Sequence, residues 1–180
     1  MRVFYAIEFQ PKMKDYLSSL QMHLKNYCIK GNFSCKENFH LTLKFIGEVD
    51  RYSLKKLKES LDYVACINNS FNLKLDNIGE FKREQKSIVW IGIKQLDNSL
   101  QLLYNSLEDN LALRGFKREN RKYRPHITLS RETTFKENCN PLNEILIDHL
   151  DIEVKQISIM ESSRINNKLT YTPIYVKNLL

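Results

Sequence analysis

The spacing of apolar and polar residues in the first part of the chain predicts alternating strands and helices. Residues 2–9 predict a strand, and Pro11 suits the first turn of a helix whose apolar positions recur every three or four residues as far as Cys28. Residues 39–45 alternate strictly between apolar and polar, which predicts a strand with two different faces. The apolar face carries Leu41, Leu43 and Phe45, and the polar face carries His40, Thr42 and Lys44.

The same order of elements then occurs again. A helix that Ser53 is suited to cap follows the polar-faced strand, and strand-like runs come next at residues 71–81 and 87–93. A helix from Asp97 leads to residues 123–130, where apolar residues again alternate with His, Thr and Ser. Weaker patterns near the end of the chain predict one helix and two strands, at residues 141–149, 152–160 and 169–176.

Equivalent positions in the two rounds have the same spacing. The helix starts at Pro11 and Asp97 each lie 29 residues before a histidine of an alternating strand. This correspondence predicts an internal duplication of a unit of about 90 residues. We therefore expect a single domain over residues 1–180, built from two interleaved lobes that correspond to residues 1–90 and 91–180.

Composition excludes several classes of protein. With 42% hydrophobic and 27% charged residues, and only 5 Gly and 4 Pro among 180 residues, the chain is neither collagen-like nor disordered. No apolar run approaches the roughly 18 residues of a membrane span, and charge interrupts the N-terminal run too early for a signal peptide. The four cysteines lack paired-ligand spacing and are typical of reduced thiols. We expect a cytoplasmic monomer that does not contact a membrane.

The positive charge is concentrated in one segment. The chain has 28 Lys and Arg against 21 Asp and Glu, a net charge of +7, and residues 114–131 contain seven basic residues against one acid, Glu119. A solvated charged loop would explain such a run by itself. Because the run ends at the second alternating strand, it instead favours an anionic partner such as nucleic acid or phosphate.

The two alternating strands carry the same motif, His-x-Thr-Leu. The first copy contains His40 and Thr42, and the second contains His126 and Thr128. In a chain with four His and six Thr, one His-x-Thr match is expected by chance roughly 0.13 times and two independent matches roughly 0.01 times. Because the copies also occupy equivalent positions of the repeat, they indicate a functional site.

This motif suits the chemistry of phosphate esters. Residues two apart on a strand point to the same face about 6.6 to 6.8 Å apart, so a His and a Thr can reach one small anion together. A pseudo-twofold axis would place the second pair across the same cavity, with one imidazole as base and the other as acid. Imidazole has an ordinary pKa of about 6.5 and can therefore hold either protonation state near neutral pH.

The remaining candidate residues have simpler interpretations. Neither motif histidine has a partner at zinc-site spacing, so we expect no metal and no cofactor. A surface or structural position is the simpler interpretation for His23 and His149. Trp90 and Phe81 are candidates for stacking a base, although a core position is the simpler interpretation for Trp90.

Two segments resemble the signatures of the 2H phosphoesterase superfamily, and more narrowly those of the RNA 2',3'-cyclic phosphodiesterases, also described as 2'-5' RNA ligases. They are residues 40–49, HLTLKFIGEV, and residues 121–131, RKYRPHITLSR. The resemblance covers nearly the whole chain. We expect an α+β fold of two pseudo-symmetric lobes, whose antiparallel sheets form a central cleft with helices on the outside.

The resemblance also implies a reaction. A terminal 2',3'-cyclic phosphate of RNA would be hydrolysed to a 2'-phosphomonoester without a metal. His40 would donate a proton to the departing 3'-oxygen, and His126 would activate water. Thr42 and Thr128 would bind the phosphoryl oxygens.

Two arginines are further candidates for binding the phosphate. Arg131 matches a family arginine of this kind, but strict alternation points it away from His126, so contact would require a β-bulge or the end of the strand. Arg124 points the right way in that alternation and is the less familiar match to the family.

Two alternatives remain open at this point. Within the same chemistry, the substrate of the protein would be a 2'-5' linkage, a small cyclic nucleotide or a pair of tRNA halves to be joined. In another class, the chain would be a non-catalytic module that binds RNA or nucleotides in the same cleft. Such a module would bind a 2'-phosphate without turning over the cyclic ester.

Overall fold

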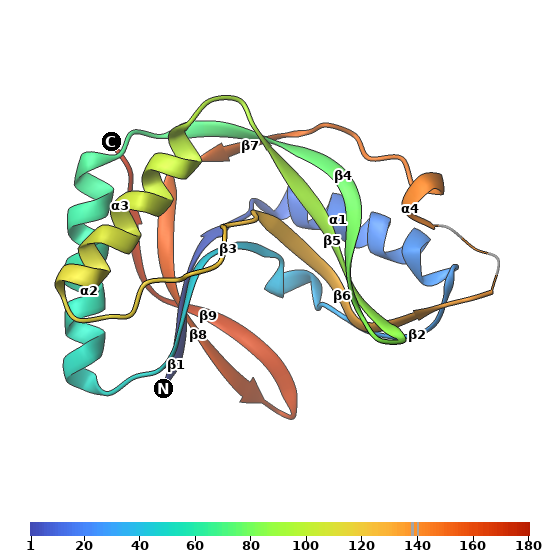
Figure 1. Cartoon of the computed structure of the whole chain (residues 1–180), viewed down its shortest axis with the longest axis horizontal. Coiled ribbons are helices and arrows are strands. Elements are labelled where there is room, and N and C mark those ends of the chain that lie inside the picture. Colours follow the sequence, from blue (N-terminus) through green and yellow to red (C-terminus); the bar gives the residue numbers. More distant parts are fainter. Residues whose placement is uncertain (138, 140) are drawn as a thin grey trace.

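The computed structural model describes residues 1–137, 139 and 141–180, which form two antiparallel sheets flanked by helices (Figure 1). The first sheet has the strand order β3 (His40–Glu48), β1 (Arg2–Glu8), β8 (Gln156–Ile165) and β9 (Lys168–Asn178). The second sheet has the order β2 (Cys28–Phe33), β6 (His126–Phe135), β5 (Lys86–Gln95), β4 (Phe71–Arg83) and β7 (Asp151–Val154). The expected α+β class with antiparallel sheets is confirmed.

The helices lie on the outside of the two sheets. They are α1 (Pro11–Lys25), α2 (Arg51–Ile67), α3 (Ser99–Leu113) and α4 (Pro141–Glu144), with a short 3-10 turn at Lys36–Asn38. Helix α2 packs on β8, β9 and α3, whereas α1 contacts β2 and β6. In Figure 1, α2 and α3 accordingly lie together at one end of the molecule, away from α1. None of the helices in the described ranges is long and apolar enough to cross a membrane.

The two sheets repeat the same strand order. Strands β3, β1 and β8 in the first sheet correspond to β6, β5 and β4 in the second. Strand β4 comes from the first half of the chain but lies in the second sheet, and β8 comes from the second half but lies in the first. The exchange interleaves the two halves, so the fold consists of two related lobes. Each sheet contains two strands from the other half of the chain, which are β8 and β9 in the first sheet and β2 and β4 in the second.

Alternation along β1 decides which face of the first sheet joins the core. Every second residue of β1 points into the main core cluster and is at most 1% exposed; these residues are Val3, Tyr5 and Ile7. Phe4 and Ala6 point to the opposite face and form a small separate cluster with Met160. The opposite face of the sheet is the one that carries the candidate site.

The boundaries of two predicted helices were wrong. Helix α2 is capped by Asp50 and not by Ser53, because the Asp50 carboxylate accepts a hydrogen bond of 2.7 Å from the Ser53 amide. Helix α1 ends at Lys25, and Cys28–Phe33 forms strand β2 where the apolar spacing suggested more helix. The partner of β2 is β6, far away along the chain, so local periodicity carried no information about this pairing.

The later elements follow the predictions less closely. The strand expected over residues 152–160 is divided between β7 and β8, which lie in different sheets. The helix expected over residues 141–149 is limited to Pro141–Glu144. The strand expected over residues 123–130 begins at His126, since Pro125 has no N–H to donate to a neighbouring strand. The strands expected near residues 71–81, 87–93 and 169–176 are confirmed as β4, β5 and β9.

Candidate active site

Each His-x-Thr pair lies at the start of a strand. His40 begins β3, and His126 begins β6. The residues that follow the two histidines, Leu41 and Ile127, are fully buried. Each histidine and its threonine therefore share the other face of their sheet, the histidine face. On β3 the Thr42 Oγ1 lies 2.9 Å from the His40 Nε2, and on β6 the equivalent residue is Thr128.

The two imidazoles are held in the same way. The Nδ1 atom of His40 lies 2.7 Å from the carbonyl oxygen of Asn38, and the Nδ1 atom of His126 lies 2.7 Å from that of Arg124. A carbonyl only accepts hydrogen bonds, so Nδ1 carries the proton in both rings. In the neutral form each Nε2 therefore has a lone pair that accepts hydrogen bonds, and the Nε2 of His40 accepts one from the Thr42 hydroxyl. This atom can take up or release the proton that a reaction moves.

The environment favours the neutral form of both histidines. Burial is the main cause that lowers the pKa of His40 from 6.5 to about 4; the Asn38 carbonyl opposes this effect, and the charges of Arg131, Lys14 and His126 add to it. Burial also lowers the pKa of His126, and the charge of Arg131 adds to that shift. Both rings are neutral near pH 7 in the free protein, and an anionic substrate would favour protonation of one of them.

A hydrogen bond links the segment just before β6 to strand β3. The Tyr123 hydroxyl, just before β6, donates a hydrogen bond of 3.0 Å to the Thr42 carbonyl on β3. The charge of Arg131 acts on both imidazoles, and that of His126 acts on His40. Because such effects weaken with distance, Arg131 and the two histidines lie close enough for their charges to act on one another.

Aromatic rings pack against each imidazole. The Phe4 ring centroid lies 4.9 Å from that of His40, and the Tyr171 centroid lies 5.1 Å from it. On the second sheet, Phe81 lies 5.1 Å from His126 in an edge-on arrangement, and Trp90 lies 6.2 Å away. The core interpretation of Trp90 is only partly right, because this side chain is half-buried on the histidine face, and its ring covers Gly79, where a Cβ atom would lie 2.3 Å from it.

A β-bulge follows Thr42 and reverses the alternation of β3. One step along β1 is opposed by two steps along β3, from Thr42 to Lys44. Lys44 is therefore buried on the helix side, at 8% exposure, and the expectation that it shares a face with His40 was wrong. Phe45 is 52% exposed and lies on the histidine face, opposite Phe4 of β1.

The same irregularity follows Thr128 on β6. One step along β5 is opposed by two steps along β6, from Thr128 to Ser130. Ser130 is fully buried and accepts a hydrogen bond of 2.7 Å from the Thr133 hydroxyl, although alternation predicts it beside His126. The reversed alternation brings Arg131 to the histidine face. Contact between Arg131 and the site requires a β-bulge, and this irregularity in β6 provides one.

Arg124 contributes its backbone to the site geometry. Its carbonyl accepts the hydrogen bond from His126 Nδ1, and its side chain is exposed. The expectation that its guanidinium binds substrate therefore stays a prediction.

A buried ion pair supports β3 from behind. Lys44 Nζ lies 2.5 Å from Glu108 Oε1 of α3, and both side chains are less than a tenth exposed. Lys44 also donates to the Lys117 carbonyl at 3.0 Å, and the second oxygen of Glu108 accepts from the Glu119 amide at 3.1 Å. This network fixes the start of the basic segment against α3 and β3.

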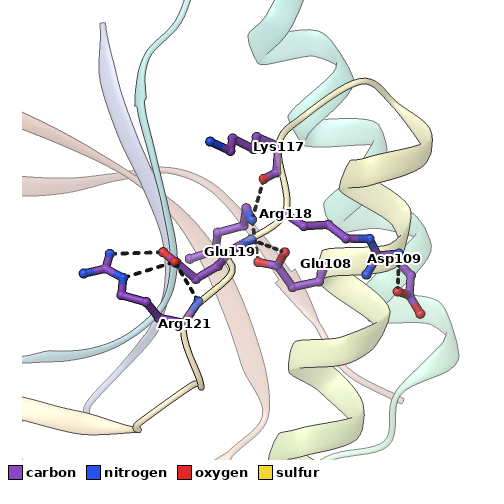
Figure 2. Close-up of polar contacts among 7 residues, drawn as sticks. Glu108, Asp109, Lys117, Arg118, Glu119 and Arg121 are labelled. Atoms are coloured by element: carbon purple, nitrogen blue, oxygen red, sulfur yellow. Dashed lines mark hydrogen bonds and ion pairs between the residues drawn. The ribbon is translucent and has the colours of Figure 1, made fainter.

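Acidic neighbours neutralise part of the basic segment. Arg118 pairs with Asp109 at 2.7 Å, and Arg121 pairs with Glu119 at 3.1 Å (Figure 2). Both pairs are exposed and contribute little to stability. The count of seven basic residues therefore overstates the charge that this segment presents to an anion, and Arg131 stands out as the one whose charge reaches both histidines.

Asn38 is a site residue that the sequence did not indicate. Its side-chain amide donates to the Leu169 carbonyl at 2.8 Å and accepts from the Tyr171 amide at 3.1 Å, which docks strand β9 beside His40. Its backbone carbonyl holds His40 Nδ1. The only available signal was its position two residues before His40, which matches that of Arg124 before His126.

The remaining candidates lie outside this site. Within the described part of the chain, no group of three or more His, Cys, Asp or Glu side chains is arranged to hold a metal ion. His23 is exposed on α1, and His149 Nδ1 lies 2.9 Å from the Leu75 carbonyl on the second sheet.

Solved structures with the same architecture define the class of protein. The chain matches E. coli LigT complexed with 3'-AMP with a TM-score of 0.80 and 28% identity, covering 99% of this chain and 97% of that one. TT0787 of Thermus thermophilus has a TM-score of 0.83 at 19% identity, a likeness of fold alone, over 99% of this chain and 98% of that one. A structure described as a phosphoesterase also matches, with a TM-score of 0.78 and 28% identity over 99% of this chain and 97% of that one, so the fold is that of a two-lobed phosphoesterase.

Sequence relatives identify the family. The RNA 2',3'-cyclic phosphodiesterase of Methanocaldococcus jannaschii is 33% identical over 180 residues, which cover 97% of this chain and 98% of that protein. That of Thermotoga maritima is 30% identical, covering 97% of this chain and 91% of that protein. The model of the family described as LigT-like phosphoesterase matches residues 7–90 and 91–171. The chain belongs to this family of the 2H superfamily, and the resemblance inferred from its two motifs is confirmed.

Proposed function

We propose that the protein hydrolyses the terminal 2',3'-cyclic phosphate of RNA to a 2'-phosphomonoester without a metal ion. The observation that carries this proposal is the paired arrangement of His40 and His126, each anchored through Nδ1 so that Nε2 is the atom that exchanges a proton. The names of the relatives as RNA 2',3'-cyclic phosphodiesterases and the 3'-AMP complex of E. coli LigT support the choice of substrate.

In the proposed reaction, the two imidazoles act on opposite sides of phosphorus. His126 Nε2 accepts a proton from water as the water oxygen bonds to phosphorus. The bound anionic phosphate favours protonation of His40, which takes up a proton at Nε2. As the bond from phosphorus to the 3'-oxygen breaks, His40 Nε2 gives this proton to that oxygen and returns to its neutral form. The acid and base roles follow the family resemblance, because the pseudo-symmetry treats the two rings alike. Their protonation states are restored by a proton transfer after product leaves.

The phosphoryl oxygens would be bound by groups on the same faces. Thr42 and Thr128 supply hydroxyl donors, and Arg131 supplies a charge that the β6 bulge brings to the histidine face. Arg124 would contact a more distant part of the substrate through its exposed side chain. Fixed donors of this kind stabilise the charge that develops on the oxygens in the transition state.

The same proposal treats residues 1–180 as one domain that acts as a cytoplasmic monomer. Both histidines come from one chain, so a second copy is not needed to complete the pair. The four cysteines form no disulfide among the residues described, which suits a reducing compartment.

The test is incubation of the purified protein with a short RNA ending in a 2',3'-cyclic phosphate, in EDTA, followed by identification of the product. We expect the 2'-phosphate, and we expect His40→Ala and His126→Ala each to lower kcat by about 10²- to 10⁴-fold. His23→Ala, on the exposed side of α1, is the matched control and should retain activity. Wild-type turnover by either site variant would remove that histidine from the mechanism. Binding of RNA without turnover would favour the non-catalytic module.

A further inference from the structure

A solvent-exposed aromatic side chain lies on the histidine face of the first sheet, away from the histidines. Phe45 is 52% exposed and pairs across the strands with Phe4. Phe4 is only 3% exposed, and its ring packs against His40 at 4.9 Å. The two phenyl groups therefore continue the surface of the site along β3, and Phe45 is the one whose ring a ligand can reach.

A cation accompanies this ring. The Arg2 guanidinium lies 4.8 Å from the Phe45 ring centroid. The cross-strand neighbour of Arg2 is Glu48, but that carboxylate pairs with the N-terminal amino group at 3.3 Å. Over the described ranges, Arg2 has no ion-pair partner of its own, so its charge is available to an anion.

The position of this pair indicates what would bind there. Phe45 is five residues along β3 from His40, a distance of roughly 15 Å at strand rise. A base on the same ribose as a phosphate held at His40 is too close to reach it. Nucleotides further upstream in a single strand come that far, and an aromatic face beside an arginine is a common way to bind unpaired bases and their phosphates.

We propose that Phe45 and Arg2 form a subsite for single-stranded RNA upstream of the terminal phosphate, with a base stacked on Phe45 and a backbone phosphate near Arg2. This inference rests on the proposed function, because it takes the histidine pair as the place of the terminal phosphate. It makes the protein selective for the ends of RNA chains over cyclic mononucleotides.

The chain supplies a matched control for this subsite. Tyr52 is 68% exposed, with the Lys56 ammonium group 4.7 Å from its ring centroid, on helix α2. It offers the same kind of aromatic and cationic pair as Phe45 and Arg2 but lies outside the histidine face. An effect that depends on the subsite appears with Phe45→Ala and not with Tyr52→Ala.

The experiment compares kcat/KM for a hexanucleotide with a 2',3'-cyclic end and for the corresponding cyclic mononucleotide. We expect wild type to prefer the hexanucleotide, and Phe45→Ala to reduce this preference by about 5- to 100-fold, as expected for the loss of one stacked base. Phe45→Tyr should retain it. An unchanged preference in Phe45→Ala would overturn the proposal.

A binding measurement separates failure of the subsite from failure of the proposed function. Anisotropy of a labelled hexanucleotide with a 2'-phosphate end reports affinity whether or not turnover occurs. Arg2→Gln should make the slope of log affinity against log salt shallower by about 0.7, the value for one phosphate contact on a single strand. An unchanged slope in Arg2→Gln, together with wild-type affinity in Phe45→Ala, would rule out the subsite even if the cyclic ester is not the substrate.

Discussion

The two His-x-Thr strands share one backbone plan but have different surroundings. A separation of 86 residues relates His40 to His126, and the same separation relates Asn38 to Arg124, Lys44 to Ser130 and Phe45 to Arg131. In both strands a carbonyl two residues earlier holds the imidazole, and a bulge follows the threonine. The Nδ1 anchoring of the histidine and the bulge are therefore duplicated, and on β3 the Thr42 hydroxyl also bonds His40 Nε2.

The difference lies in the residues beyond the bulge. On β6 the position that returns to the histidine face is Arg131, whose charge acts on both imidazoles. On β3 the equivalent position is Phe45, which is open to solvent. A repeated backbone can therefore hold two equivalent proton carriers, while one copy provides charge for a phosphate and the other an aromatic surface.

The largest expected difference between the strands is the loss of stability when the buried polar residue after the bulge is replaced, Lys44 on β3 or Ser130 on β6. Lys44→Ala leaves Glu108 buried without its partner and should lower the free energy of unfolding by about 3–5 kcal/mol. Ser130→Ala, at the equivalent position, loses one neutral hydrogen bond and should cost about 1 kcal/mol. Urea unfolding measures both changes. The double variant Lys44→Met/Glu108→Leu should recover much of the lost stability; equal costs for Lys44→Ala and Ser130→Ala would contradict the assigned difference.

The second difference is the pH dependence that His40 gives to stability. Between pH 6.5 and about 4, the unfolded His40 binds a proton that the folded side chain does not, so the free energy of unfolding falls as pH falls through this window. For this one group the loss is on the order of 3 kcal/mol. Urea titrations at several pH values should show a shallower slope in His40→Gln, and less change in His126→Gln, which is less deeply buried. A slope that neither variant alters would assign the pH dependence to other groups.

Arg131 provides the next test. Arg131→Gln removes a charged donor to the phosphate and should lower kcat/KM by about 10- to 150-fold. It also removes a positive charge that, in addition to burial, lowers the pKa of both imidazoles, so both pKa values should rise. Kinetics with a cyclic mononucleotide and NMR titration of the two rings measure these effects. A rise confined to one ring would show that Arg131 belongs to only one half of the site.

The smallest expected effects are those of replacing Asn38 and Arg124, the two residues whose carbonyls hold the imidazoles. Asn38→Ala removes the two side-chain hydrogen bonds to β9 and should lower kcat about 3- to 10-fold by loosening the position of His40. Arg124→Ala keeps the carbonyl that holds His126, so any effect should appear in KM. Steady-state kinetics distinguishes the two outcomes, and Asn38→Asp, which keeps an acceptor for the Tyr171 amide, should be intermediate. A larger kcat effect from Arg124→Ala would reverse this assignment.

Much of the architecture was accessible from local patterns. The period of apolar residues located the main helices and strands, and the repeated spacing of His40 and His126 indicated two related halves with one polar pair in each. Strand β2 was missed because its partner β6 is distant in the chain. The run over residues 152–160 was predicted as one strand because the local pattern does not show that β7 and β8 join different sheets.

The sequence by itself determined the chemical inventory of this protein: two histidines and two threonines on alternating strands, at equivalent positions of a duplicated unit. Only the tertiary structure decided which neighbours share their face. One extra residue after Thr42 in β3 and after Thr128 in β6 reverses the alternation of the residues that come next, burying Lys44 and Ser130 and turning Phe45 and Arg131 toward the site. The physical reason is that a bulge is defined by the pairing of two strands, and a linear pattern within one strand does not contain that pairing.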